Sequence, residues 1–305
     1  MQKEISNEIK HKAIQQGFSY CGIAKITSLE KENLYLSKWL ENGFHGEMKY
    51  MENYFDKRIQ PDLLIENAKS VISVLLNYFP ANKIEETDNY NIAKYAYGKD
   101  YHYIIKSRLN QIIELIQQEF PESSSRAFCD SAPVMDKVWA QRSGLGWIGK
   151  NTCLITPKMG SFFLIGEIIC DIDLSFDIPI KDHCGNCTRC IDACPTHAIQ
   201  APYQLDARKC LSYLSIEYKN ELTADNKPSQ NNRIFGCDIC QDVCPWNLRF
   251  AIPTHDIDLQ PTEALTKMRK QDWQHLSKPD FNKLFKNTAL ERTGYERLKR
   301  NITSL

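Results

Sequence analysis

The 305-residue sequence has no net charge and no long apolar run. Its 38 Lys and Arg side chains balance its 38 Asp and Glu side chains, which argues against a protein that coats nucleic acid through its overall charge. No apolar stretch approaches the roughly twenty residues of a membrane-spanning helix. The first ten residues, MQKEISNEIK, are too polar for the apolar core of a secretion signal. We therefore expect a cytoplasmic protein without a membrane partner.

The sequence also lacks internal repeats, except for two cysteine motifs that hold eight of its twelve cysteines. The first motif is C-x2-C-x2-C-x3-C-P, and the second is a stretched copy that also ends in Cys-Pro. Such spacing directs three thiolates at one iron–sulfur cluster, while the cysteine before the proline ligates the other cluster in two-cluster ferredoxins. The pattern predicts two [4Fe–4S] clusters, one held by Cys184, Cys187, Cys190 and Cys244 and the other by Cys194, Cys210, Cys237 and Cys240.

Structural zinc is the alternative reading of these motifs, because C-x2-C pairs also hold zinc. Zinc needs neither the third cysteine nor the closing Cys-Pro, so we favour the clusters. A reducing compartment keeps such thiols free of disulfides, which agrees with a cytoplasmic location. The remaining cysteines lie in apolar or strand-like surroundings and are expected to be small buried side chains; they are Cys21, Cys129, Cys153 and Cys170.

Alternating helical and strand-like patterns in the first half predict an α+β layered domain. The expected helices cover residues 4–16, 29–40, 101–120 and 133–142, the last with Pro133 at its first position. The expected strands cover residues 18–24, 71–79 and 125–129, and residues 152–155 and 161–170 are expected to pair with each other. Helical patterns return over residues 262–270 and 290–299.

These patterns suggest three domains. We expect a catalytic core over residues 1–180, a two-cluster module over 181–250 and a basic helical segment over 251–305. From residue 261 onward the sequence contains ten Lys and Arg but only five Asp and Glu. Most of the excess positive charge lies around Lys283, Lys286, Arg292, Arg297, Lys299 and Arg300. Such a surface suits the phosphates of a nucleic acid, although a solvated helix face has a similar composition.

A glycine-rich loop, Gly144-Leu-Gly-Trp-Ile-Gly149, spells the G-x-G-x-x-G of dinucleotide-binding proteins. That fingerprint must leave a strand and open a helix. Here the predicted helix comes first and the strand follows, so we reject a dinucleotide site. The glycines instead let the backbone approach a flat or bulky ligand. Lys150 and Asn151 at the loop exit are candidate contacts, but a surface hairpin would carry similar residues.

Asp130 is the candidate proton donor. It follows the strand expected over 125–129, where a side chain commonly points into a cleft, and a reductase needs protons because clusters carry only electrons. Asp130 could equally cap the helix expected from Pro133. Asp136, inside that helix, is expected at the surface or in a salt bridge.

Six segments, spread in order over nearly the whole chain, together resemble the epoxyqueuosine reductase family. They are Asp56–Arg58, Tyr97–His102, Cys129–Asp130, Arg142–Asn151, Cys184–Thr196 and Cys237–Pro245. That family is related to the cobalamin-dependent reductive dehalogenases. The resemblance implies a nitroreductase-like, cobalamin-binding core fused to a two-cluster ferredoxin-like module, with a short helical C-terminus.

The resemblance implies that epoxyqueuosine is reduced to queuosine at the wobble position of tRNA, the last step of queuosine biosynthesis. The clusters would pass electrons from an external low-potential donor to base-off cobalamin, and Asp130 would be the proton donor. The implied cobalamin contacts are Arg58, Asp130, Lys150, Asn151, Leu154, Ile165, Ser212 and Asp238. Some family members have a cysteine near the corrin, but Ala93 stands there in this sequence, so no catalytic thiol is expected.

Three other functions remain open on the sequence alone. The chain could be a dicluster ferredoxin-type electron carrier, another cobalamin-dependent reductase or a zinc-stabilised RNA-binding protein. An electron carrier has no use for stoichiometric cobalamin, and a zinc protein would be colourless rather than brown.

Overall fold

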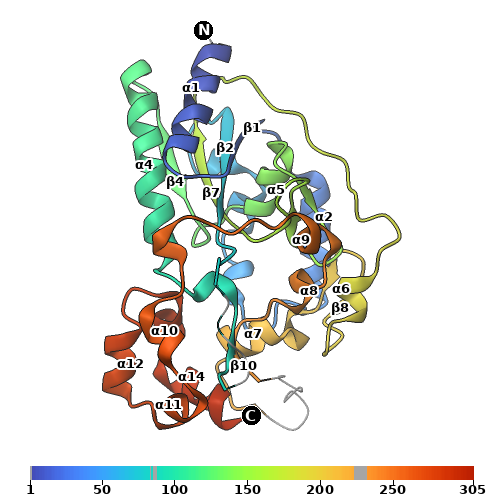
Figure 1. Cartoon of the computed structure of the whole chain (residues 1–305). Helices are drawn as coiled ribbons and strands as arrows, with labels where there is room; N and C mark the ends of the chain where they lie inside the picture. The colour runs from blue at the N-terminus through green and yellow to red at the C-terminus, as the bar shows by residue number, and fades with distance from the viewer. Residues whose placement is uncertain (1, 83, 85–87, 223–231) are drawn as a thin grey trace.

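A four-stranded antiparallel sheet forms the centre of the first half of the chain (Figure 1). The computed structural model describes residues 2–82, 84, 88–222 and 232–305. The strand order is β1 (Tyr20–Lys25), β2 (Ser70–Asn77), β7 (Phe163–Cys170) and β4 (Ser125–Phe128). All eight residues of β2 are buried. A strand that is apolar on both faces must be covered on both, which places β2 and β7 in the interior of the sheet.

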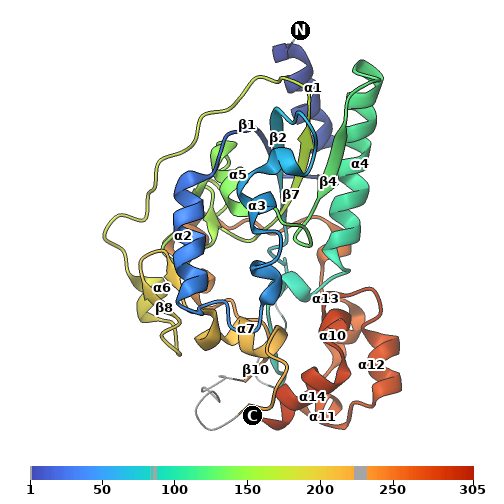
Figure 2. The same cartoon turned by 180° about the vertical axis from the view of Figure 1, so that it is seen from behind.

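Helices cover both faces of this sheet, as the two opposite views in Figures 1 and 2 show. Helices α1 (Gln2–Gln15) and α4 (Tyr101–Glu119) pack side by side on one face. Helix α4 buries an isoleucine and leucine stripe at helical spacing, so one face of it enters the core. Helix α5 (Asp136–Arg142) packs on the opposite face, with α2 (Glu30–Glu41) and α3 (Phe55–Ile59) nearby. The result is a three-layer mixed helix and sheet core.

The sheet corrects two of the sequence predictions. Strand β7 pairs with β2 and β4, whereas β6 (Leu154–Ile155) pairs with β5 (Trp147–Ile148) and not with β7. Helix α5 begins at Asp136 rather than at Pro133. Residues 129–135 instead form a loop, in which Asp130 has a φ of 57°, and this left-handed conformation separates the strand from the helix.

The segment with the cysteine motifs consists of short elements along the edge of the core (Figure 1). They are α6 (Arg189–Asp192), β8 (Ile199–Ala201), β9 (Gln204–Leu205), α7 (Leu211–Ile216), β10 (Arg233–Phe235), α8 (Ile239–Asp242) and α9 (Pro245–Phe250). Five 3-10 helices connect elements of the described chain: η1 (Lys49–Met51), η2 (Pro61–Leu63), η3 (Lys94–Ala96), η4 (Ala207–Lys209) and η5 (Ile257–Leu259). None of the helices in the described ranges is both long and apolar enough to cross a membrane.

The C-terminal segment forms more and shorter helices than the two expected. They are α10 (Glu263–Lys267), α11 (Lys270–His275), α12 (Lys278–Leu284), α13 (Ala289–Thr293) and α14 (Tyr295–Thr303). These helices, through residues such as Trp273, share one hydrophobic core with Tyr97 and Phe235 from the two earlier segments. Strand β3 (Asn91–Ile92) also pairs in parallel with β10. The three segments of the sequence are therefore packed into each other through a common core.

Two cations of the expected basic face have internal partners. Arg300 is only 8% exposed. Its Nη1 donates to the carbonyls of Tyr218 and Asn220 at 2.8 and 2.5 Å, and its Nη2 donates to the carbonyl of Leu214 at 2.8 Å. Arg297 donates to another carbonyl of α7. These contacts fix α14 to α7, so Arg300 is a structural residue and does not belong to a phosphate-binding face.

We expect Arg300→Met to destabilise the fold by about 2–4 kcal/mol, because three carbonyls lose a charged donor inside the protein. Lys286→Met is the matched control, since Lys286 is exposed, and should change the free energy of unfolding by no more than about 0.5 kcal/mol. Urea unfolding of the two variants measures both values. If Arg300→Met were as stable as wild type, the contacts of Arg300 with the three carbonyls would not stabilise the fold.

Candidate active site and cluster-binding segment

A cavity of about 490 Å³ lies where the core meets α7 and the C-terminal helices. Tyrosines and charged groups share its wall. The lining residues include Tyr50, Tyr54, Arg58, Tyr95, Tyr101, His102, Asp130, Phe235, Arg292 and Arg297. Tyr50 and Tyr54 remain 49% and 67% exposed, so aromatic surface is available at the rim. The cavity therefore combines flat apolar walls with convergent polar groups, as ligand sites usually do.

Asp130 is held in this cavity by the first turn of α4. The Tyr101 hydroxyl donates to Asp130 Oδ2 at 2.6 Å, and His102 Nε2 lies 3.3 Å from the same oxygen. On its other side, His102 Nδ1 lies 2.6 Å from Asp100 Oδ1. Asp100 is the N-cap of α4, which fixes its carboxylate beside the ring. Asp130 does not cap α5, whose N-cap is Met135 without a side-chain hydrogen bond.

These contacts decide where the proton of the pair resides. Burial alone would raise the pKa of Asp130, but the hydrogen bonds from His102 and Tyr101 outweigh it and lower that pKa. Burial would lower the pKa of His102, but Asp100 and Asp130 outweigh it and raise that pKa. Asp130 is thus ionised and His102 is the proton-bearing partner. The Asp130 side chain is 61% exposed and that of His102 only 10%, so Asp130 faces the cavity.

Positive charge surrounds this pair. Arg292 from α13 contacts the His102 ring, with Nη1 2.5 Å from Nε2, and it lowers the pKa of Asp130 further. Arg58 from α3 is 9% exposed and donates through Nη2 to the Tyr50 carbonyl at 2.8 Å. Its Nε is buried and has no hydrogen-bond partner in the described chain. That unpaired donor at the cavity wall marks a position where a bound group can accept a hydrogen bond.

The cysteines of the two motifs lie in two groups. Cys184, Cys187, Cys190 and Cys244 line one cavity of about 180 Å³. The other four also interact with each other, Cys210 with Cys194 and both Cys237 and Cys240 with Cys210. Burial raises the pKa of Cys190 and Cys237 to about 11. These thiols are therefore protonated when free, and metal binding must release their protons.

Two residues expected to contact a bulky ligand instead support the cysteine segment. Lys150 Nζ donates to the carbonyls of Gly185 and Cys187 at 2.6 and 3.0 Å. Asn151 Nδ2 donates to the carbonyl of Cys240 at 3.3 Å. The glycine-rich loop that precedes them follows α5 and leads into β5, in agreement with our rejection of a dinucleotide site.

The other residues implied as cobalamin contacts lie apart from the large cavity. Leu154 and Ile165 pack in the apolar layer beneath α5. The backbone of Ser212 interacts with the thiol of Cys210, and Asp238 is buried next to α8. Of the eight implied contacts, the structure brings only Arg58 and Asp130 to the cavity wall.

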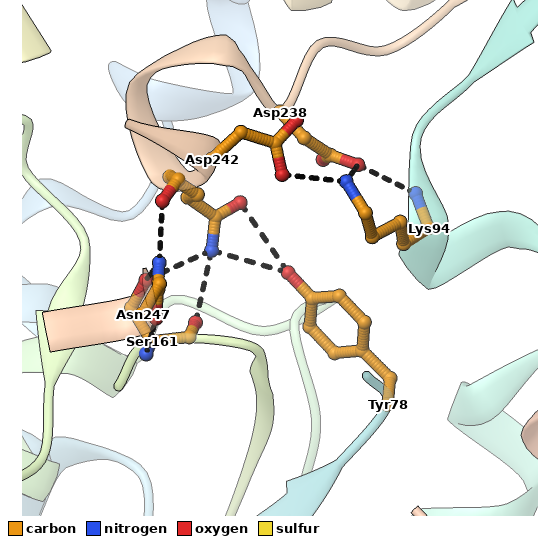
Figure 3. A network of polar contacts seen from close by, with 7 residues as sticks. Tyr78, Lys94, Ser161, Asp238, Asp242 and Asn247 are labelled. Atoms are coloured by element: carbon orange, nitrogen blue, oxygen red, sulfur yellow. Dashed lines mark hydrogen bonds and ion pairs between the residues drawn. The ribbon is translucent and has the colours of Figure 1, made fainter. Parts of the chain in front are cut away.

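A buried polar network joins the cysteine segment to the core (Figure 3). Lys94 Nζ lies 3.3 Å from Asp238 Oδ2 and 2.7 Å from Asp242 Oδ1, and the Lys94 backbone N–H donates to Asp238 at 2.8 Å. Asn247 donates to Ser161 Oγ at 2.9 Å. Burial raises the pKa of Asp238, while Lys94 opposes that rise. Each partner thus compensates for the other's burial.

Sequence reasoning missed several of these residues. Nothing marked Lys94 as buried, and His102 was part of a family motif without a role of its own. Cys153, expected to be an isolated thiol, lies against Cys240. Asp136, expected at the surface or in a salt bridge, is half-buried, and its carboxyl lies against that of Glu167. Contacts between residues so far apart in sequence leave no local pattern.

Two family models match this chain. One, described as "4Fe-4S double cluster binding domain", covers residues 183–247. The other, described as "Epoxyqueuosine reductase QueG, DUF1730", covers residues 58–131 and so includes Arg58 and Asp130. A double-cluster segment next to a cavity with an acid defines an iron–sulfur oxidoreductase, and the zinc reading of the cysteines loses its support.

The curated relatives identify the family. An epoxyqueuosine reductase from Cellulophaga algicola is 52% identical over 300 residues, which are 98% of this chain and 97% of the relative. The enzyme of the same name from Escherichia coli is 37% identical over 304 residues, which are 98% of this chain and 80% of the relative. The chain belongs to the epoxyqueuosine reductase family.

Solved structures agree with this assignment. A crystal structure of epoxyqueuosine reductase with an epoxyqueuosine-modified tRNA-Tyr stem loop superposes with a TM-score of 0.91 and 27% identity, covering 99% of this chain and 80% of that one. A catabolic reductive dehalogenase superposes with a TM-score of 0.51 and 15% identity over 97% of this chain and 39% of that one. The dehalogenase shares the fold.

We expect Lys94→Met to weaken the docking of the cysteine segment by about 3–5 kcal/mol, because it leaves Asp238 as a buried, unpaired charge. Lys99→Met is the control: it removes an ion pair with Asp258 in which Lys99 is 65% exposed, worth less than about 1 kcal/mol. Urea unfolding and the rate of iron loss to a chelator report the effect. Identical iron loss from the two variants would contradict a docking role for Lys94.

Proposed function

We propose that this chain reduces epoxyqueuosine to queuosine in tRNA. The observation that carries the proposal is an identity of 52% to an epoxyqueuosine reductase across 98% of the chain, with the acid-bearing cavity inside the matched range. Reduction converts the epoxide to an alkene and releases its oxygen as water, which consumes two electrons and two protons. The exposed faces of Tyr50 and Tyr54 suit the stacking of unpaired anticodon bases.

The electrons enter through the cysteine segment. We assign one [4Fe–4S] cluster to Cys184, Cys187, Cys190 and Cys244 and the other to Cys194, Cys210, Cys237 and Cys240. The grouping of these thiols in the structure supports this crossed assignment. When bound, the clusters would relay single electrons from an external low-potential donor. Lys150 and Asn151 hold the backbone around both sites.

We propose that cobalamin binds at the large cavity as the group that meets the substrate. The unpaired Nε of Arg58 is a donor for a polar substituent of the corrin, and the tyrosine walls suit its flat faces. Bound base-off cobalamin would supply a low-valent cobalt that delivers electrons to the epoxide. The other contacts implied by the family resemblance lie outside the wall of this cavity and are proposed from the resemblance alone; they are Lys150, Asn151, the backbone near Leu154 and Ile165, Ser212 and Asp238. We also propose that the core is nitroreductase-like, that the chain has three domains and that the protein is cytoplasmic.

The protons come from the Asp130–His102 pair. As the epoxide opens, negative charge develops on its oxygen, and a positioned acid lowers that barrier. His102 holds the proton beside Asp130, and Asp130 presents it to the cavity. The pair delivers one proton, takes up another from solvent and delivers that as the second proton of the reduction. Tyr101 keeps its own proton, because burial raises the pKa of its phenol. Its hydroxyl therefore orients the Asp130 carboxyl rather than titrating.

Asp130→Asn tests the acid directly. The amide cannot carry the proton, so we expect turnover to fall by about 10²–10⁴-fold while iron, sulfide and cobalamin contents stay at wild-type levels. Queuosine formation is measured by mass spectrometry of tRNA incubated with reconstituted protein, cobalamin and a low-potential reductant. Wild-type protein that forms no queuosine would refute the function, and an active Asp130→Asn variant would refute the role of Asp130.

The pH profile tests His102. Because its pKa in the folded protein lies above the ordinary value of 6.5, the pair carries its proton below that raised pKa and loses it as pH rises through it. Turnover should fall over the same range. His102→Gln removes the titrating group, so kcat should drop by about tenfold or more and the part of the fall that follows the His102 pKa should disappear. His275→Gln, on the exposed α11, should keep the wild-type profile, and a retained profile in His102→Gln would exclude the relay.

A further inference from the structure

Glu167 is an unusual residue for the middle of a sheet. It lies in the central strand β7, its side chain is fully buried, and no hydrogen-bond donor in the described chain reaches either of its carboxyl oxygens. The group that it meets is the carboxyl of Asp136, one of whose oxygens is likewise buried without a donor. A buried carboxylate without a donor is costly. The contact therefore requires a proton between the two acids.

The two acids lie at the two ends of the loop that carries Asp130. Glu167 is directly opposite Phe128, the last residue of β4, in the register of the sheet. Asp136 is the first residue of α5. Residues 129–135 connect these points. A bond between Glu167 and Asp136 therefore ties the start of α5 to the sheet and closes the base of the loop.

Charges from several elements face this pair. Burial and the neighbouring carboxyl raise the pKa of Glu167, with Asp130 adding to the rise. Asp136 faces Glu167 and Asp130, with Lys137 on its own helix and Arg58 on α3. The thiol of Cys129 lies close to all three acids. From β2, the residue opposite Glu167 is Ser73, which carries no charge. Glu167 thus keeps the proton and donates it to Asp136, which faces Arg58.

We propose that Glu167 and Asp136 form a proton-dependent clamp that holds the Asp130 loop in the cavity. With one shared proton the pair is a single hydrogen bond of net charge −1. Without it, two carboxylates repel each other next to Asp130, the first turn of α5 separates from the sheet, and Asp130 leaves Tyr101 and His102. Both acids are positioning residues, and only the consequence for catalysis depends on the proposed function.

The direction of the pH effect follows from the raised pKa of Glu167. A group whose pKa is higher in the closed state stabilises that state at low pH and loses its contribution as pH rises through the raised value. The clamp should therefore be closed at low pH and release as pH rises through the raised pKa of Glu167.

Hydrogen exchange of residues 129–135 in the complete, cluster-loaded protein tests the clamp without substrate. After correction for the chemical exchange rate, wild-type loop amides should lose at least about tenfold in protection between about pH 6 and about pH 9, the equivalent of one pKa unit of coupling. Glu167→Gln donates to Asp136 without titrating, so its loop should stay protected throughout. Glu167→Leu should be unprotected even at the lower pH.

Two controls keep the outcome interpretable. Glu122→Gln changes an exposed glutamate just before β4 and should behave as wild type, and the amides of α4 should keep their protection in every variant that folds. If Glu167→Leu does not fold, wild type and Glu167→Gln still decide the matter. Wild-type protection that is independent of pH, or a Glu167→Gln loop as pH-sensitive as wild type, would overturn the clamp. Neither result depends on turnover of epoxyqueuosine.

Discussion

The contact on which the rest of the structure depends is the pairing of the buried Lys94 with the buried Asp238 and the partly exposed Asp242. The cysteine segment is made of helices of four to six residues, too short to be stable alone. It must be held by the clusters and by the core. Lys94 supplies the second support from a position next to the cavity wall, and the hydrogen bonds of Ser161 and Asn247 extend it along the same seam (Figure 3). The electron path and the cavity are thereby fixed relative to each other.

In the proposed mechanism, protons and electrons would approach the substrate from different sides of this arrangement. The cysteines lie at the edge of the core, while the proton-carrying pair stands at the start of α4, opposite α7. The low pKa of Asp130 would be a poor property for an isolated acid. It becomes useful next to His102, because His102, whose pKa is raised, holds one proton for the pair and the more exposed Asp130 presents it to the cavity. Arg292 limits how strongly His102 holds that proton, since a nearby cation disfavours a second positive charge.

Much of the fold was predictable because it follows from local patterns. The apolar stripe of α4 was predictable from its helical period, and the mostly apolar β2 from its composition. The pairing of β7 could not be predicted, because the sequence of an apolar strand does not specify which strands lie beside it. Asp130 could be proposed from its place after a strand and from the family motif. Its partnership with His102, and the acid pair of Glu167 and Asp136, depend on which faces the sheet and α5 present to each other. The buried role of Arg300 was hidden for the same reason: charge patterns alone do not distinguish an internal cation from a surface one.

The most direct test of the account is a single turnover that uses only electrons stored in the protein. The clusters are reduced, excess reductant is removed, and cobalamin-loaded protein is mixed with tRNA that carries epoxyqueuosine. The reduced-cluster signal is followed by electron paramagnetic resonance while queuosine is counted by mass spectrometry. The account predicts that two stored electrons disappear for each queuosine formed. Queuosine formation without loss of that signal, or by protein that lacks the clusters, would contradict it.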